Sequence, residues 1–127
     1  MMLIDLKAIF ADYNAQITWN TFYYDTEKSF QAHCDDFDFS DDLFQANIHP
    51  NQNIILDIGV PNWHEPNACF IIYVVQDYDW DKPLKKVCTD NIHILIQEIK
   101  LILVEYSLRL LTLDEKLAKM YSATQQP

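Results

Sequence analysis

Carboxylate and aromatic side chains alternate in two short segments of this chain, and their type and spacing suggest one kind of chemistry. The first segment lies within residues 35–42, and the second is the run DYDWD at residues 77–81. Aromatic side chains anchor protein interfaces, and carboxylates around them pair with lysine and arginine on a partner. The pattern therefore predicts a protein-binding surface. Its candidate residues are Asp35, Asp36, Asp38, Asp41, Asp42, Asp77, Tyr78, Asp79, Trp80 and Asp81.

Negative charge is concentrated in the same part of the sequence. Residues 1–81 contain fourteen Asp and Glu but only Lys7 and Lys28, whereas residues 82–127 contain five acids and seven bases. Such a surface repels nucleic acids and acidic membranes and attracts basic proteins. Two other interpretations stay open. The acids could form a solvated face, or they could bind calcium, although their spacing lacks the glycine turn and terminal glutamate of an EF-hand.

Residues capable of catalysis or metal binding lack the spacing that those functions need. The chain has one glycine, Gly59, which excludes glycine-rich phosphate loops because these need several positions without a Cβ. His33-Cys34-Asp35-Asp36 contains metal-binding atoms, but neighbouring side chains on a strand point to opposite faces. His64-Glu65 has acid–base groups, and a solvated loop is the simpler interpretation. We therefore expect no enzymatic activity, no metal and no cofactor.

The elements that must position the first acidic segment are predicted from apolar spacing. Residues 3–13 have helical spacing, and the β-branched and aromatic residues 16–24 predict a strand. Residues 29–34 are interpreted as a second strand. Ser40-Asp41-Asp42 is interpreted as the cap of a helical turn that runs to about Ala46.

Two predicted strands with stronger signals precede the second acidic segment. Residues 53–60 are apolar and β-branched with Asp57 as the exception, and residues 69–78 are apolar along most of their length. The loop between them contains Pro61 and Pro66, so the two strands are predicted to pair antiparallel. Among the aromatic residues we expect Trp19, Phe22 and Phe70 in the core. The alternating acids of DYDWD favour exposure of Tyr78 and Trp80.

The pattern becomes helical after Lys82-Pro83. Thr89 or Asp90 caps a predicted helix at 90–111, and a capping box at Thr112–Glu115 predicts another helix from Leu113 to about Tyr121. The first of these helices has a second apolar stripe, Ile94, Leu101 and Leu108. We expect this stripe to be buried within the same domain, with a subunit interface as the alternative.

These elements together predict one α+β domain at residues 1–121 and a flexible tail at 122–127. The domain would be an antiparallel sheet of four or five strands, with an N-terminal helix and long C-terminal helices packed on one face. Three cysteines without paired spacing argue against a disulfide framework. The start of the chain lacks the pattern of a signal peptide, and no run of about 18 apolar residues occurs. We therefore expect a cytoplasmic protein without a membrane span.

In size, acidity and mixed architecture the chain resembles the small immunity proteins that bacteria pair with secreted nuclease toxins, including those of contact-dependent inhibition. The segments Asp35–Asp42 and Asp77–Asp81 carry this resemblance. It implies a cytoplasmic inhibitor that binds a basic toxin and blocks its active site without a cofactor or direct nucleic-acid binding. Two alternatives stay open: a DNA mimic that inhibits DNA-binding proteins, and an acidic secretion chaperone. The identity of the partner, the acidic segment that forms the interface, the strand order and a homo-oligomeric state are left open.

Overall fold

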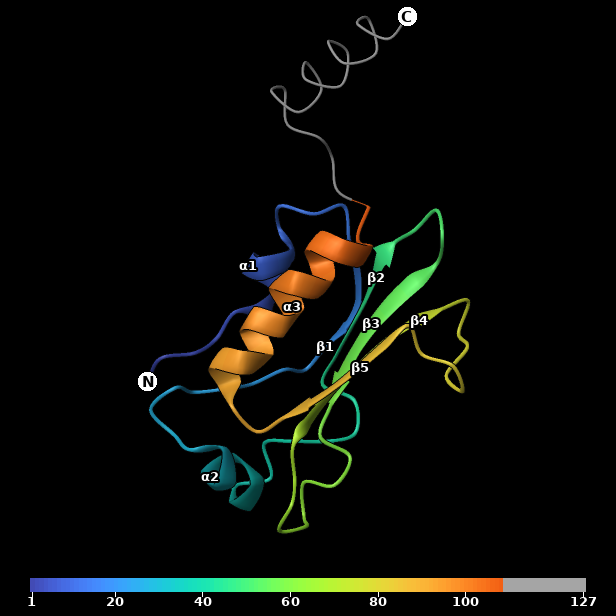
Figure 1. The fold of residues 1–127 in the computed structure, drawn as a ribbon. Coiled ribbons are helices and arrows are strands. Elements are labelled where there is room, and N and C mark those ends of the chain that lie inside the picture. Colours follow the sequence, from blue (N-terminus) through green and yellow to red (C-terminus); the bar gives the residue numbers. More distant parts are fainter. Residues whose placement is uncertain (109–127) are drawn as a thin grey trace, which may run out of the picture.

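The fold is built around a five-stranded antiparallel sheet (Figure 1). The structure is a computed structural model that describes residues 1–108. The strands are β1 (Gln16–Asn20), β2 (Phe44–His49), β3 (Ile54–Gly59), β4 (Phe70–Gln76) and β5 (Lys85–Thr89). Their order in the sheet follows the chain, β1-β2-β3-β4-β5, so each strand pairs with its neighbour in sequence. The described helices are α1 (Leu6–Phe10), α2 (Phe30–Asp35) and α3 (Ile92–Tyr106).

One face of the sheet is buried because apolar residues alternate along its inner strands. Figure 1 shows α1 and α3 on the same side of the sheet, where they cover this face. Burial of each leucine-sized side chain stabilises the fold by about 1.5–3 kcal/mol, so this helix–sheet layer is a major source of stability. Its members include Leu6 and Phe10 of α1, Phe44, Ala46, Leu56, Ile58, Ile72 and Val74 of the sheet, and Leu95, Ile99, Ile102 and Leu103 of α3.

The opposite face of the sheet is not covered by any of the described helices (Figure 1). Its central row crosses all five strands in register and combines aromatic, polar and charged side chains. This row consists of Trp19, Gln45, Asp57, Tyr73 and Lys86. Ile55 and Val75 form a buried pair on the same face and are not part of the helix-side core. We call this surface the open face.

The prediction of an α+β fold with an antiparallel sheet is confirmed, and its strand number is five. Strands at 53–60 and 69–78 are confirmed as β3 and β4, which pair antiparallel. The prediction of long C-terminal helices is wrong for residues 1–108, where α3 is the one long helix. The predicted helix at 113–121 and the predicted tail at 122–127 lie outside the described residues.

The predicted strand at 29–34 is wrong, because these residues form α2. The Ser29 hydroxyl caps this helix by accepting a hydrogen bond from the Ala32 N–H at 3.0 Å. The capping bond satisfies one of the backbone donors that a helix start leaves free. A six-residue helix shows too little of its 3.6-residue period for its apolar pattern to be told from that of a strand.

The predicted helical turn from Ser40 to Ala46 is also wrong, because Phe44–His49 is β2. Ser40 does not cap a helix; its hydroxyl donates to the Asp42 carbonyl at 3.0 Å. Phe44, Ala46 and Ile48 are buried and the residues between them are half-buried, which is the period of two of a strand. The strand pattern therefore begins at Phe44, and Ser40-Asp41-Asp42 has the residue types of a helix cap without forming one.

Two helix predictions are shortened, and one strand was missed. The helix predicted at 3–13 covers Leu6–Phe10, and the helix predicted at 90–111 covers Ile92–Tyr106, with Asn91 as its cap. β5 was missed because Lys85–Thr89 is short and lies beside the helical pattern. No helix among residues 1–108 is both long and apolar enough to cross a membrane.

The second apolar stripe of α3 is not buried within the described domain. Half of the Leu101 side chain is exposed (50%), and Ile94 and Val104 are exposed as well. Leu108 is half-buried, and its N–H donates to the Ile48 carbonyl at 2.8 Å. The expectation that Ile94 and Leu101 pack against the same domain is therefore wrong for residues 1–108.

Candidate functional site

The two predicted acidic segments lie at opposite ends of the sheet. The register places Phe44, which follows the first segment, beside Ile58 and Ile72 at one end. It places Gln76, which precedes the second segment, beside Ile54 at the other end. Strands of six residues at about 3.3 Å per residue separate these ends by roughly 20 Å. The structure therefore does not bring the ten predicted site residues together in one cluster.

The second segment forms a tight turn after β4. Asp77 and Tyr78 have φ angles of 54° and 60°, and the Asp79 N–H donates to the Gln76 carbonyl at 3.1 Å. Positive φ is uncommon outside glycine, so this turn is a strained arrangement. Tyr78 and Trp80 are both exposed, as expected, and the ring of Trp80 also packs edge-on against Tyr73, with the ring centroids 6.3 Å apart. Asp79 and Asp81 are exposed.

Two acids of the first segment are engaged within the chain. The Lys28 ammonium lies 2.7 Å from Asp36 and 2.8 Å from Asp38. Hydrogen bonds to Asp36 and then Asp38 raise the pKa of Lys28 above its ordinary value. Partial burial acts to raise the pKa of Asp38, but hydrogen bonds from Lys28 and His33 outweigh it and lower the pKa. Asp36 and Asp38 are therefore partly neutralised before any partner arrives.

His33 is a structural residue of this acidic segment. It is fully buried, and its Nδ1 donates to Asp38 Oδ2 at 2.8 Å, because a carboxylate can only accept. Its Nε2 then accepts from the Asp25 N–H at 3.2 Å, and its ring lies 4.2 Å from that of Tyr24. Among residues 1–108 no group of three or more His, Cys, Asp or Glu side chains is placed to hold a metal ion.

Of the three remaining acids, Asp35 is exposed at the end of α2 and accepts a hydrogen bond from Gln31 Nε2 at 2.9 Å. Asp41 and Asp42 lie on a loop that crosses the end of β3. Gly59 permits this crossing, because a Cβ there would lie 1.8 Å from the Asp41 carbonyl oxygen. Hydrogen bonds from Val60 N–H to the Ser40 carbonyl and from Leu43 N–H to the Ile58 carbonyl, both 2.9 Å, hold the loop. Both acids are exposed, and neither forms an ion pair within the described part of the chain.

Three aromatic side chains that the sequence did not assign to the site lie in or near the first acidic segment. Trp19 was expected in the core, but it is 51% exposed because it points to the open face. Phe37 has a φ of 58° and is 76% exposed, and its ring packs edge-on against Trp63 at 5.3 Å. Phe70 is fully buried as expected, and Phe22 is half-buried. Simple alternation along β1 places Trp19 on the same face as Ile17, but the register shifts between these two residues, so Ile17 pairs with Ala46 of the helix-side core and Trp19 pairs with Gln45 of the open face.

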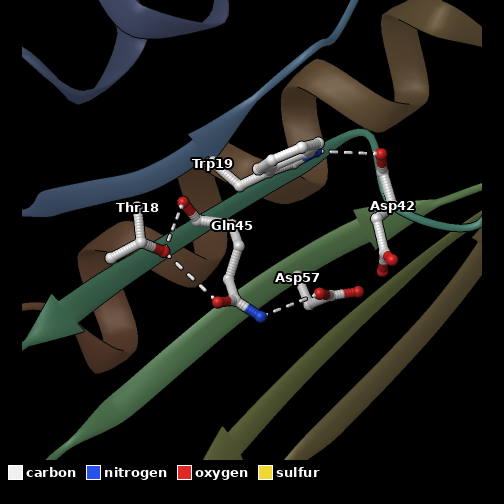
Figure 2. A pocket seen from close by; sticks show the side chains of 5 residues that line it. All are labelled: Thr18, Trp19, Asp42, Gln45 and Asp57. Atoms are coloured by element: carbon white, nitrogen blue, oxygen red, sulfur yellow. Dashed lines mark hydrogen bonds between the residues drawn. The ribbon is translucent and has the colours of Figure 1, made fainter.

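A shallow pocket of about 300 Å³ lies between β1, β2, β3 and the Asp41–Asp42 loop (Figure 2). Its lining residues are Thr18, Trp19, Asp42, Gln45 and Asp57. The Thr18 hydroxyl donates to Gln45 Oε1 at 3.2 Å, and Gln45 Nε2 donates to Asp57 Oδ2 at 3.2 Å. The Trp19 indole N–H donates to the Asp42 carbonyl at 3.1 Å. These hydrogen bonds fix the side chains of the pocket before any ligand binds.

Asp57 is the polar exception in β3, and the structure places it in this pocket. Burial raises the pKa of Asp57, the nearby Asp42 charge raises it further, and the hydrogen bond from Gln45 opposes both. A carboxyl group with a raised pKa in a hollow is a functional-site candidate, because a stable fold gains nothing from a poorly solvated charge. Sequence reasoning noted Asp57 as an exception in an apolar strand but did not assign it to a site.

The pocket continues into a second hollow lined by Trp19, Ser40, Asp41, Asp42 and Trp63. The two hollows share Trp19 and Asp42, and Trp63 links them to Phe37. We call the resulting surface the acidic–aromatic surface and define it by six residues: Trp19, Phe37, Asp41, Asp42, Asp57 and Trp63. It lies at the end of the sheet that also carries α2 and the 61–68 loop (Figure 1).

Comparisons of this chain with protein families, with curated proteins and with solved structures give no match.

Proposed function

We propose that this protein is an inhibitor of the immunity type, which binds a basic toxin domain through the acidic–aromatic surface. One observation carries the proposal: Trp19 and Trp63 line a hollow with Asp41 and Asp42, whose exposed carboxylates have no ion-pair partner within residues 1–108, and the exposed Phe37 packs against Trp63. Exposed tryptophan side chains anchor protein interfaces, and carboxylates around them select partners with lysine and arginine. The partner class is therefore a basic protein.

Inhibition would work by occupying the cations that a nuclease uses to hold nucleic-acid phosphates. Asp41, Asp42 and Asp57 present carboxylates that compete for those cations, and the aromatic side chains add apolar contact area. Electrostatic attraction speeds the encounter of the two proteins, and the aromatic contacts slow their separation. The mechanism needs no cofactor and no chemical step.

We assign the interface to the acidic–aromatic surface rather than to Asp77–Asp81. The DYDWD turn lies at the other end of the sheet, so one compact interface does not include both. The DNA-mimic alternative requires carboxylates spaced like duplex phosphates, about one charge per 1.7 Å of helix axis. Separate clusters at the two ends of the sheet, with Asp36 and Asp38 paired to Lys28, favour a protein partner instead.

The first step is to read the gene immediately upstream; if it encodes a large secreted protein with a basic C-terminal domain, that domain is the binding probe. Association rates are measured by stopped-flow fluorescence at low and high ionic strength for the wild type and for an Asp41→Asn/Asp42→Asn double variant. We expect the double variant to associate several-fold more slowly and to depend less on salt. The matched control is Asp79→Asn/Asp81→Asn, which removes the same charge at the other end. Equal losses in both variants, or association without salt dependence, contradict the proposed interface.

A secretion chaperone is the second candidate, and the exposed stripe of α3 favours it. Chaperones of this kind need an apolar surface for a second copy or for a client segment, and Ile94, Leu101 and Val104 provide one. A dimeric wild-type protein that also retains an unfolded segment of an adjacently encoded secreted protein would support this candidate over the inhibitor.

A further inference from the structure

We infer that the pocket between Trp19, Asp42 and Asp57 is a receptor for a single arginine side chain of the partner protein. This inference rests on the proposed function and adds to it the chemical group that the surface recognises. The pocket is more than a group of acids, because it is a shaped hollow with one aromatic wall, an amide and two carboxyl groups.

The carboxyl group of Asp57 forms the floor of the pocket. It lies on β3, the middle strand, in the central row of the open face. Gln45 donates to its Oδ2, whereas no described residue donates to its Oδ1. Figure 2 shows the Asp42 side chain directed from the loop toward Asp57, so two carboxyl groups face one hollow. An incoming cation therefore meets acceptors that the chain has left available.

Trp19 forms the wall of the pocket. Its indole N–H bonds to the Asp42 carbonyl at 3.1 Å and to the Thr21 hydroxyl at 3.2 Å, so both its position and its rotation are fixed. About half of the side chain is exposed. A cation over the face of tryptophan gains about 0.5–1 kcal/mol at an exposed site and more where water is excluded.

An arginine side chain matches this arrangement better than a lysine side chain or a metal ion. The guanidinium group is planar, stacks on an aromatic face and has five donors in a fixed fork. Asp57, Asp42 and Gln45 Oε1 supply the matching acceptors. A lysine ammonium is more strongly hydrated and does not stack as a plane. Calcium takes six to eight oxygen ligands, and no group of three or more metal-binding side chains is placed for it in the described residues.

The state of Asp57 in the free protein agrees with this role. Its raised pKa shows that burial and the Asp42 charge make its ionised form unfavourable in the absence of a partner. An arginine bound between the two carboxyl groups would reverse this effect, because an opposite charge within about 4–6 Å favours the ionised form.

The test is a nuclear magnetic resonance titration of the ¹⁵N-labelled full chain with N-acetyl-arginine methylamide. Matched titrations use the lysine analogue and the citrulline analogue, which has the shape of arginine without its charge. We expect the arginine compound to shift the Trp19 indole N–H and the Gln45 side-chain amide in a saturable way. The lysine compound should bind more weakly, and the citrulline compound should cause no saturable shift.

Three variants locate the binding. Asp57→Asn should weaken arginine binding about tenfold or more, as expected for loss of a hydrogen bond to a charged group. Asp42→Asn, on the exposed rim, should cause a smaller loss, and Asp79→Asn at the other end of the sheet should cause none. The dispersion of each amide spectrum reports whether that variant is folded.

Several results would overturn the inference. They are equal binding of the citrulline or lysine compound, no saturable shift of Trp19, and unchanged affinity in a folded Asp57→Asn variant. If the toxin domain still binds with the expected salt dependence, only the arginine pocket is wrong. If the arginine compound binds and the toxin domain does not, the pocket stands and the proposed partner is wrong.

Discussion

Asp57 and Asp38 are both partly buried acids, and their neighbours shift their pKa values in opposite directions. Asp38 accepts hydrogen bonds from Lys28 and His33, which lower its pKa despite its burial. Asp57 has one amide donor and a second acid nearby, so burial and the Asp42 charge raise its pKa. The first carboxylate stabilises the fold when it is ionised, and the second destabilises it. This contrast separates a structural acid from a candidate binding acid.

We predict that Asp57→Asn stabilises the free protein at neutral pH. The folded-state pKa of Asp57 lies above the unfolded-state value, so stability falls as pH rises through the interval between them. The variant removes this loss and keeps an oxygen that can accept from Gln45. Thermal melts should show a higher Tm than the wild type at neutral pH and little difference below the unfolded-state pKa. A lower Tm at neutral pH would show that Asp57 has a structural role.

We predict the opposite result for Asp38→Asn. The lowered pKa means that ionised Asp38 stabilises the fold above its unfolded-state pKa, and this stability is lost as pH falls through the folded-state value. The variant also weakens a hydrogen bond to buried His33. Chemical denaturation at neutral pH should show a loss of about 1–3 kcal/mol. The difference from wild type should shrink in acid, and a constant difference would contradict the linkage.

At the scale of the elements, α3 has one buried side and one side that keeps apolar residues exposed. Ile99 is fully buried against the sheet, whereas Leu101, two residues later, is half exposed. Single exposed apolar residues are ordinary on protein surfaces, but Ile94, Leu101 and Val104 line one side of a single helix. The two sides of α3 therefore provide a matched pair of substitutions.

We predict that Ile99→Asp unfolds the protein and that Leu101→Asp leaves it folded. An unpaired charge in the core is strongly unfavourable, whereas surface substitutions usually change stability by about 0.5 kcal/mol or less. Thermal melting measures the stability, and light scattering measures the mass. If the stripe is a subunit interface, Leu101→Asp should also convert a dimer into a folded monomer. An unfolded Leu101→Asp variant would show that the stripe is buried after all.

How far the sequence predicts this structure depends on the strength of each local pattern. β3, β4 and α3 were predicted because their segments, 53–60, 69–78 and 90–111, are eight or more residues long and mostly apolar, which makes strand and helix patterns distinct. α2 and β5 were missed because five or six residues do not show a period, and only the Ser29 cap distinguished the helix. For the site, the exposure of Trp19 depends on the register shift between Ile17 and Trp19, which moves Trp19 to the open face and which no local pattern announces. Asp57 was not assigned to the site because its neighbours in the pocket come from other strands and from the Asp41–Asp42 loop.

At the scale of the whole molecule, the fold places like charges close together. The formal net charge is −10 at pH 7, and acids gather at both ends of the sheet. Among residues 1–108, Lys28 is the one lysine that forms ion pairs with the first acidic segment. Self-repulsion of this kind destabilises a compact state but keeps molecules apart in solution. Under the proposed function, the same field would attract a basic partner from a distance.

We predict that added salt stabilises the free protein and weakens its complex. Screening shortens the range of charge interactions to about 8 Å at physiological ionic strength, so repulsion between the acids should decrease. Thermal melts at increasing sodium chloride concentration should show a rising Tm, while affinity for the toxin domain falls. Sodium sulfate, which stabilises proteins by exclusion from their surface, provides a comparison for effects other than screening. A falling Tm in sodium chloride would mean that favourable ion pairs dominate.

The order of the strands has a consequence for how another chain can approach. An open sheet ends in two strands with unsatisfied backbone groups, which can recruit a strand from a second molecule. Here β1 is interrupted by a register shift between Ile17 and Trp19, and β5 carries Lys85 and Lys86, so both edges are poor templates for such recruitment. A partner of the proposed kind would therefore meet the broad face of the sheet rather than its edge strands. Recognition would rest on side chains, which evolution can exchange one at a time without altering the backbone that supports them.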